Sequence, residues 1–244
     1  MLEVREVAVE SGGKIIVKRA NLSVYRGETV LLMGPNASGK SSLLKAIAGH
    51  PRYSIVHGSV YLDGEDITHL SAKERVAKGL ALALQNPPIL RGVTVRTLLH
   101  RILKRRGMSE TEIEREIARI AKLLAIESLL DREFGRGFSG GELKRVEIAT
   151  LMALKPRIAL IDEPDSGVDV DSVLLIATAI DDMAKHGVDG MVVVTHSGLI
   201  ARHITHSRAY IMLDGYIVHE GSSSEILNVV LSKGFTPFKQ VIET

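Results

Sequence analysis

Several features are missing from this 244-residue chain, and each absence excludes a class of function. The chain has no cysteine, which excludes disulfide bonds and any metal centre ligated by its own thiolates. No apolar run approaches the ~18 residues that span a bilayer, and the first five residues do not open like a secretory signal peptide. We therefore expect a cytoplasmic protein with no direct membrane insertion.

The chain also has no large net charge of either sign. The 31 lysines and arginines nearly balance the 29 aspartates and glutamates, and the net charge of +2 gives no electrostatic basis for nucleic acid as a partner. Hydrophobic residues make up 45% of the chain and charged residues 25%, as in folded globular proteins. The length suffices for one large domain or two small lobes around a sizeable core.

The chain does contain a glycine-rich loop over residues 34–41. The apolar run 29–33 predicts a strand before the loop, and a helical pattern follows it. Backbone N–H groups at such a junction are unpaired and the helix N-terminus adds partial positive charge, so the junction binds an anion. Lys40 offers an ammonium for the β- and γ-phosphates, and Ser41 a hydroxyl for Mg²⁺. The loop by itself predicts ATP or GTP as the ligand. The residues expected to hold it here are Gly34, Pro35, Asn36, Ala37, Ser38, Gly39, Lys40, Ser41 and Ser42.

Two acidic residues follow a predicted core strand at 158–161. Asp162 is the expected partner of Ser41 at the magnesium ion, although a strand-end cap explains an isolated aspartate equally well. Glu163 is not needed for the metal, and we expect it to orient or deprotonate an attacking water. The adjacent pair therefore predicts hydrolysis rather than transfer of the phosphoryl group to a second substrate.

A second glycine-rich helix start, Ser139-Gly140-Gly141-Glu142, predicts a second phosphate-binding N-terminus in the same chain. With Phe138 before it and Asp162-Glu163-Pro164 downstream, it resembles the signature motif of the ATP-binding cassette family, and the resemblance covers nearly the whole chain. The resemblance implies that this segment closes over the ATP bound by a second copy of the chain, head to tail. Two ATP molecules would then be buried in each dimer.

The same resemblance implies roles for three more segments. Gln85 matches the residue that contacts Mg²⁺ and couples the site to a helical lobe, and His196 matches the switch histidine that reaches the γ-phosphate. Residues 166–169 match the loop that crosses the dimer interface. The expected catalytic residues are thus Glu163, His196 and Gln85, and the expected metal ligands are Ser41, Gln85 and Asp162.

The alternation of predicted strands and helices indicates an α/β fold of the P-loop NTPase kind, with a mainly parallel sheet flanked by helices. A small antiparallel β subdomain and an inserted helical lobe complete it. We expect a single ATPase domain over residues 1–244: a β subdomain and phosphate-loop part (1–85), a helical lobe with the signature motif (86–156) and the remainder of the core (157–244). Finer expectations are two short strands over 14–18 and 22–25, a strand starting at Ser59, and a helix from Ser197.

Within the family, several short stretches are similar to the SufC-type ATPases of iron–sulfur cluster assembly. They are residues 49–53, 85–87, 91–94, 138–145 and, above all, 165–171 (Asp-Ser-Gly-Val-Asp-Val-Asp). This similarity implies SufB/SufD-like scaffold proteins as partners, and any cluster must sit on them because the chain has no cysteine. Two alternatives stay open: the ATP-binding subunit of a membrane transporter, with transmembrane subunits as partners, and a nucleotide-gated regulatory clamp with little turnover.

Two positions depart from the family's usual pattern. Ala37 stands where the phosphate loop usually has glycine, which narrows the backbone choices there but removes no N–H donor. The aromatic residue that usually stacks on adenine is missing before the loop, where the chain offers Ser11-Gly12-Gly13. The phosphate contacts are therefore better specified by the sequence than the contacts to the base.

Overall fold

The structure is a computed structural model that describes residues 1–83 and 89–241. The strands of the described residues are β1 (Leu2–Ser11), β2 (Lys14–Val24), β3 (Glu28–Met33), β4 (Ser54–Leu62), β5 (Glu65–Asp66), β6 (Leu80–Ala83), β7 (Ile158–Asp162), β8 (Gly190–Thr195), β9 (Arg208–Leu213) and β10 (Tyr216–Ser222). The α-helices are α1 (Lys40–Ile47), α2 (Ala72–Ala77), α3 (Val95–Arg105), α4 (Glu110–Leu124), α5 (Gly140–Leu154), α6 (Val170–Lys185) and α7 (Ser223–Lys233), and the 3-10 helices are η1 (Glu127–Leu129), η2 (Ile200–Arg202) and η3 (Thr236–Val241).

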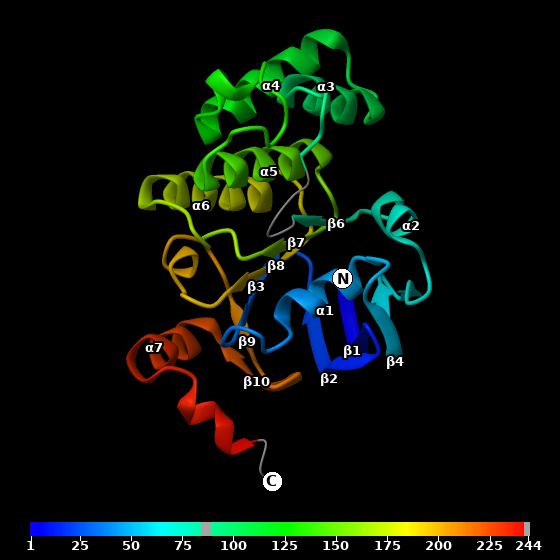
Figure 1. Ribbon diagram of the computed structural model, residues 1–244, viewed down its shortest axis with the longest axis vertical. Coiled ribbons are helices and arrows are strands. Elements are labelled where there is room, and N and C mark those ends of the chain that lie inside the picture. The colour runs from blue at the N-terminus through cyan, green and yellow to red at the C-terminus, as the bar shows by residue number, and fades with distance from the viewer. Residues whose placement is uncertain (84–88, 242–244) are drawn as a thin grey trace.

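The described strands form one mixed sheet in the order β5-β4-β1-β2-β10-β9-β3-β8-β7-β6. Strands β6, β7, β8, β3 and β9 pair in parallel, whereas β1 pairs antiparallel with both β2 and β4. In Figure 1, α3 and α4 lie at the top, above α5 and α6, and the strands lie below them. The expected fold class is confirmed: a mainly parallel core, a small antiparallel part and an inserted group of helices.

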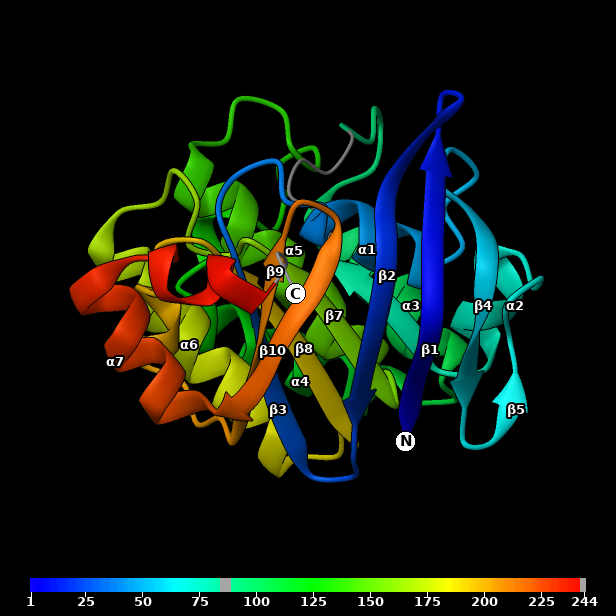
Figure 2. The same ribbon diagram turned by 90° about the horizontal axis from the view of Figure 1, so that it is seen from below.

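Two apolar layers hold the sheet, one on each face. Strand β3 contributes to both, because Leu31 and Met33 enter the layer beneath α3–α6 while Val30 and Leu32 enter the layer around α1. A parallel strand buried on both faces reads as an unbroken apolar run, as residues 30–33 do. Figure 2 shows α7 and the β1–β2–β4–β5 group on opposite sides of the central strands.

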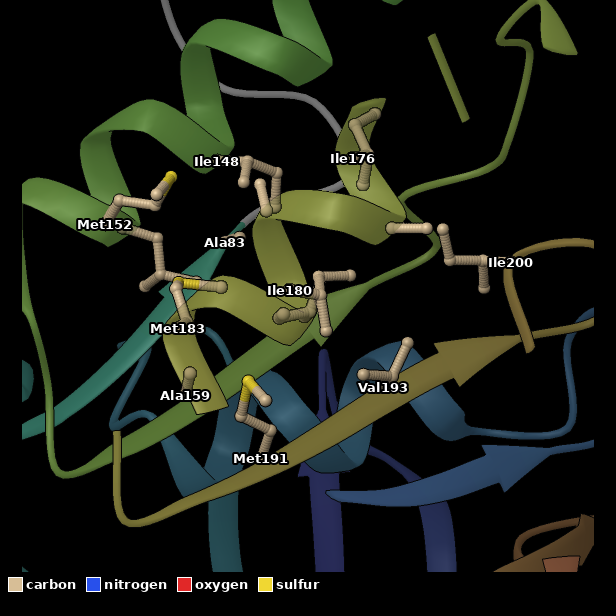
Figure 3. Packing of buried hydrophobic residues seen from close by; sticks show 14 of the residues in the cluster. Ala83, Ile148, Met152, Ala159, Ile176, Ile180, Met183, Met191, Val193 and Ile200 are labelled. Carbon is tan, nitrogen blue, oxygen red and sulfur yellow. The ribbon is translucent and has the colours of Figure 1, made fainter. Parts of the chain in front are cut away.

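Helix α6 fills the space between α5 and the sheet. Figure 3 shows Ile176, Ile180 and Met183 of this helix lying between side chains of α5 and side chains of β7 and β8. All three are at most 3% exposed, and they follow the three- and four-residue spacing of one helix face. This packing fixes where the preceding loop, residues 163–169, leaves the sheet. None of the helices in the described ranges is long and apolar enough to cross a bilayer.

Three local expectations are wrong. The strands expected over 14–18 and 22–25 are one continuous strand, β2, because antiparallel pairing with β1 runs from Ser11↔Lys14 to Leu2↔Val24. Strand β4 begins at Ser54 rather than Ser59, since its first residues pair with the far end of β1. The helix expected from Ser197 is only the three-residue η2, because Gly198 takes a positive φ of 70°.

Candidate nucleotide site

The predicted site lies where three neighbouring parallel strands end. Met33 of β3 pairs with Thr195 of β8, and Val194 pairs with Asp162 of β7, so the carboxyl ends of these strands are in register. The loops that follow them carry the glycine-rich segment, Glu163 and His196. Open parallel sheets bind their ligands at this edge, and the register places Met33 beside Thr195, 162 positions further along the sequence.

The glycine-rich loop turns tightly between β3 and α1. A side chain at Gly34 would place its Cβ 2.2 Å from the backbone carbonyl oxygen of Met212, so this position accepts only glycine. Gly39 has a φ of 109° and Ala37 a φ of 63°, both in the left-handed region. The N-cap residue Gly39 gives α1 no side-chain cap, which leaves the first N–H groups of the helix available to an anion.

Lys40 is folded into this loop. Its side chain is buried, and Nζ donates hydrogen bonds of 2.8 Å to the carbonyl oxygens of both Gly34 and Pro35. Burial lowers the pKa of the Lys40 ammonium, and the negative charges of Glu163 and Asp162 oppose that shift. Phosphate oxygens in the loop would supply further negative charge beside this ammonium.

Ser41 and Asp162 form the part of the site suited to a metal ion. Ser41 Oγ donates a 2.9 Å hydrogen bond to Asp162 Oδ1, while Oδ2 of the same carboxylate is buried and receives no hydrogen bond from the described residues. Burial raises the pKa of Asp162, against the Ser41 hydrogen bond, which lowers it. A hydroxyl and a carboxylate are hard oxygen ligands that fit Mg²⁺. No cluster of three or more His, Cys, Asp or Glu residues suited to a metal occurs in the described parts of the chain, so phosphate oxygens are the natural further ligands.

Glu163 and His196 face each other beside the loop. Glu163 has a φ of 48°, its backbone N–H donates to the carbonyl oxygen of Val194 at 3.1 Å, and its Oε1 lies 3.5 Å from Nδ1 of His196. A non-glycine residue at positive φ costs energy and is found where the surroundings enforce it, often at functional sites. Both side chains line a cavity of about 590 Å³, whose other walls are Ile16, Asn36, Ala37, Gly39, Lys40, Ser41, Ser42 and Ser166.

The signature segment does not line this cavity. Ser139 caps α5 instead: its Oγ accepts from the N–H of Glu142 at 3.2 Å, and its own N–H donates to Glu142 Oε2 at 2.8 Å. The next two residues are packed on the loop before α6 and on the first turn of α6. A Cβ at position 140 would lie 2.9 Å from Gly167 O, and a Cβ at position 141 would lie 2.6 Å from Ser172 Oγ. Both glycines of the motif are therefore required for packing within the chain.

Two residues differ from the expectations based on the sequence, and one expected site residue cannot be compared with them. Gln85, an expected metal ligand and catalytic residue, lies outside the described residues. Ile16 of β2 lines the cavity, whereas the turn Ser11-Gly12-Gly13 does not. Asp165 has no role predicted from the sequence beyond its place in the SufC-like stretch 165–171. In the structure it is buried and hydrogen-bonded to the segment that carries His196. No local pattern predicts that contact, because it joins residues 30 or more positions apart.

Comparison with known proteins identifies the family. The sequence profile of the family described as ABC transporter matches residues 17–166, a range that includes the glycine-rich loop, the signature segment and Glu163. The chain belongs to this family. It is therefore an ATP hydrolase of the ATP-binding cassette (ABC) type, with ATP and Mg²⁺ as its ligands.

Individual relatives match this ABC cassette over more of its length than the family profile does. Vegetative protein 296 of Bacillus subtilis is 35% identical over 98% of this chain and 93% of its own length. A probable ABC transporter ATP-binding protein of Streptococcus pyogenes is 36% identical over 92% of this chain and 90% of its own length. A solved dimeric ATP-binding cassette in a post-hydrolysis state, bound to ADP and Pi, aligns with a TM-score of 0.78 at 26% identity, covering 91% of this chain and 98% of that one.

Proposed function

We propose that this cassette hydrolyses ATP in a head-to-tail dimer, in which each site joins the glycine-rich loop of one copy to the signature segment of the other. The observation that carries the proposal is the composition of the cavity. Lys40, Glu163 and His196 line it, but no residue of the signature segment does. Ser139 and Gly140 are exposed, so the N-terminus of α5 is accessible to the phosphates of a nucleotide held by another copy.

Within each site, different residues of the chain bind the phosphates, hold the metal ion and activate the water. The N–H groups of residues 34–41 and the Lys40 ammonium bind the phosphates. Ser41 and Asp162 hold Mg²⁺, with Gln85 as a further ligand, and the bound ion supplies positive charge that stabilises the reacting phosphates. Glu163 orients the attacking water and accepts its proton. His196, 3.5 Å from Glu163, orients that carboxylate and reaches the γ-phosphate.

We propose further that closure of the dimer drives a conformational change in a SufB/SufD-like scaffold on which iron–sulfur clusters are assembled. The support is the similarity of residues 165–171 to SufC-type ATPases, in which the first residue is the buried Asp165. The absence of cysteine agrees with a chain that hydrolyses ATP while its partner alone ligates the cluster.

Purification of the tagged chain from its native cell tests the scaffold proposal. We expect polypeptides that contain cysteine to co-purify without detergent, and the complex to contain iron and acid-labile sulfide. A matched purification of the Lys40→Ala chain controls for dependence on nucleotide. Recovery of apolar integral membrane polypeptides only after detergent extraction, with no iron or sulfide, would overturn the scaffold role.

The second candidate is the ATP-binding subunit of a membrane transporter. It is favoured by the descriptions of similar proteins, among them a probable ATP-dependent transporter of Pyropia yezoensis that is 37% identical over 91% of this chain. Both candidates use the same chemistry and the same dimer. The purification above distinguishes them, because only the transporter subunit depends on a partner that detergent must extract.

A further inference from the structure

One buried carboxylate holds together the two loops that flank the proposed catalytic pair. Asp165 lies in the loop between β7 and α6, two residues after Glu163, and its side chain is 7% exposed in the folded chain. Its Oδ2 accepts hydrogen bonds from Thr195 Oγ1 at 2.9 Å and Ser197 Oγ at 2.7 Å. The residues on either side of His196 are thus bound to the same oxygen atom.

The same oxygen also closes the turn that follows His196. The backbone N–H of Ile200, at the start of η2, donates to Asp165 Oδ2 at 3.1 Å. Within the turn, Gly198 N–H donates to Thr195 Oγ1 at 3.1 Å and Leu199 N–H donates to Ser197 Oγ at 3.1 Å. Residues 195–200 therefore fold around one acceptor oxygen.

We propose that Asp165 is a positioning residue for ATP hydrolysis, which fixes the backbone of His196 and so the distance between its imidazole and Glu163. The proposal rests on the role proposed above for His196. Because Asp165 directly precedes residues 166–169, which are expected to cross the dimer interface, a displacement of those residues on dimer closure is transmitted to His196 through Asp165, Thr195 and Ser197. Asp165 itself touches neither the nucleotide nor the water.

Loss of Asp165 should lower turnover without loss of ATP binding. Asp165→Ala leaves the donors of Thr195, Ser197 and Ile200 without their acceptor, and a misplacement of a catalytic group by about 1 Å costs up to ~10²-fold in rate. We expect kcat to fall about 10- to 100-fold, while the Kd for ATP measured by calorimetry stays within about threefold of the unmodified chain. A loss of affinity with unchanged kcat would contradict the proposal.

A double-mutant cycle with His196→Ala separates positioning from general destabilisation. If Asp165 acts through His196, Asp165→Ala should change kcat by less than about twofold once His196 is absent, because coupled residues are non-additive. If His196→Ala alone leaves kcat unchanged, the proposed role of His196 fails. If His196→Ala lowers kcat and Asp165→Ala lowers it by the same factor in both backgrounds, only the positioning role fails.

Two more variants distinguish loss of positioning from loss of folding. Ser197→Ala removes one of the three hydrogen bonds to Asp165 and also the acceptor of the Leu199 N–H. Because Ser197 is exposed, the variant should keep the fold and lower kcat by a few-fold. Asp181→Ala is the matched control, because Asp181 Oδ1 also accepts a backbone hydrogen bond near this turn, from Thr205 N–H at 2.9 Å, but beyond the C-terminal end of η2. Turnover equal to that of the unmodified chain in Ser197→Ala, or an equal loss in Asp181→Ala, would overturn the proposal.

Discussion

The backbone of Glu163 turns the chain after β7, and its side chain faces the cavity. The left-handed backbone, at φ 48°, turns the chain away from the end of β7 while the N–H group still pairs with Val194 of the neighbouring strand. The carboxylate is thereby directed toward His196 and the cavity instead of the core. This placement supports the proposal that Glu163 is the base, rather than Asp162, which is proposed as a metal ligand.

Replacement of Glu163 by glutamine tests that identification. Glu163→Gln keeps the size of the side chain but removes its basicity, so turnover should fall ~10²- to 10⁴-fold while ATP binding is retained. Steady-state phosphate release and calorimetric titration measure the two effects separately. Glu225→Gln, at an exposed position in the first turn of α7, is the control and should hydrolyse ATP at the rate of the unmodified chain.

Ala37 offers a prediction about stability at the same loop. Its φ of 63° is a conformation that costs an alanine energy but costs a glycine none. Ala37→Gly should therefore raise the free energy of unfolding by about 0.5–1 kcal/mol in urea denaturation.

Ala48, which ends α1 in a right-handed conformation with φ −77°, is the matched control for Ala37. Ala48→Gly should lower the free energy of unfolding by about 0.5–1 kcal/mol, because glycine adds freedom to the unfolded chain and removes a methyl group packed on the apolar layer around α1. Changes of the same sign at both positions would show that backbone conformation does not govern the outcome at Ala37.

At the scale of elements, local signals predict the helices of this chain well. Ser71, Ser109 and Ser139 each begin a helix with a capping box, and each box is present in the structure. Such signals act over three or four residues and can be read directly from the sequence. The expectations that were wrong, for β2, β4 and η2, concern elements set by contacts outside their own sequence: β2 and β4 by pairing with β1, and η2 by the positive φ of Gly198 together with the acceptor Asp165.

The helix that carries the glycine-rich loop depends on one distant arginine. Arg75 is buried, and its guanidinium donates hydrogen bonds to the carbonyl oxygens of Ala46 and Ile47 at the end of α1. It also donates to the carbonyl oxygens of Leu70 and Thr68. A cation at a helix C-terminus satisfies the last carbonyls and complements the helix dipole.

Arg75→Met preserves the length of the side chain but removes all four hydrogen bonds, although the carbonyl oxygen of Ala46 still accepts from the N–H of Gly49 at 3.0 Å. The free energy of unfolding should fall by roughly 3 kcal/mol, measured by urea denaturation. Arg26→Met is the control: Arg26 is 85% exposed and pairs with Asp189, and loss of such a surface pair should cost under about 1 kcal/mol. Comparable losses in both variants would contradict a special role for Arg75 in holding α1.

At the scale of the whole molecule, the two apolar layers and the in-register strand ends explain why residues from 16 to 196 meet in one cavity. Sequence motifs predicted most of that cavity because the glycine-rich loop, Glu163 and His196 follow apolar strands. They did not predict that Ile16 lines the cavity, nor that Asp165, which does not line it, is hydrogen-bonded to the segment that carries His196. The signature segment stays outside the cavity, and this separation is the basis for a site shared by two copies.

Mixing two inactive variants tests the shared site most directly. Ser139→Arg blocks the signature segment but keeps a working glycine-rich loop, and Lys40→Ala does the reverse. Each alone should be inactive, but an equimolar mixture should recover up to about a quarter of normal turnover, since half the dimers would pair one intact loop with one intact signature. Phosphate release by the mixture no greater than the sum of the separate variants would contradict a site built from two copies of the chain.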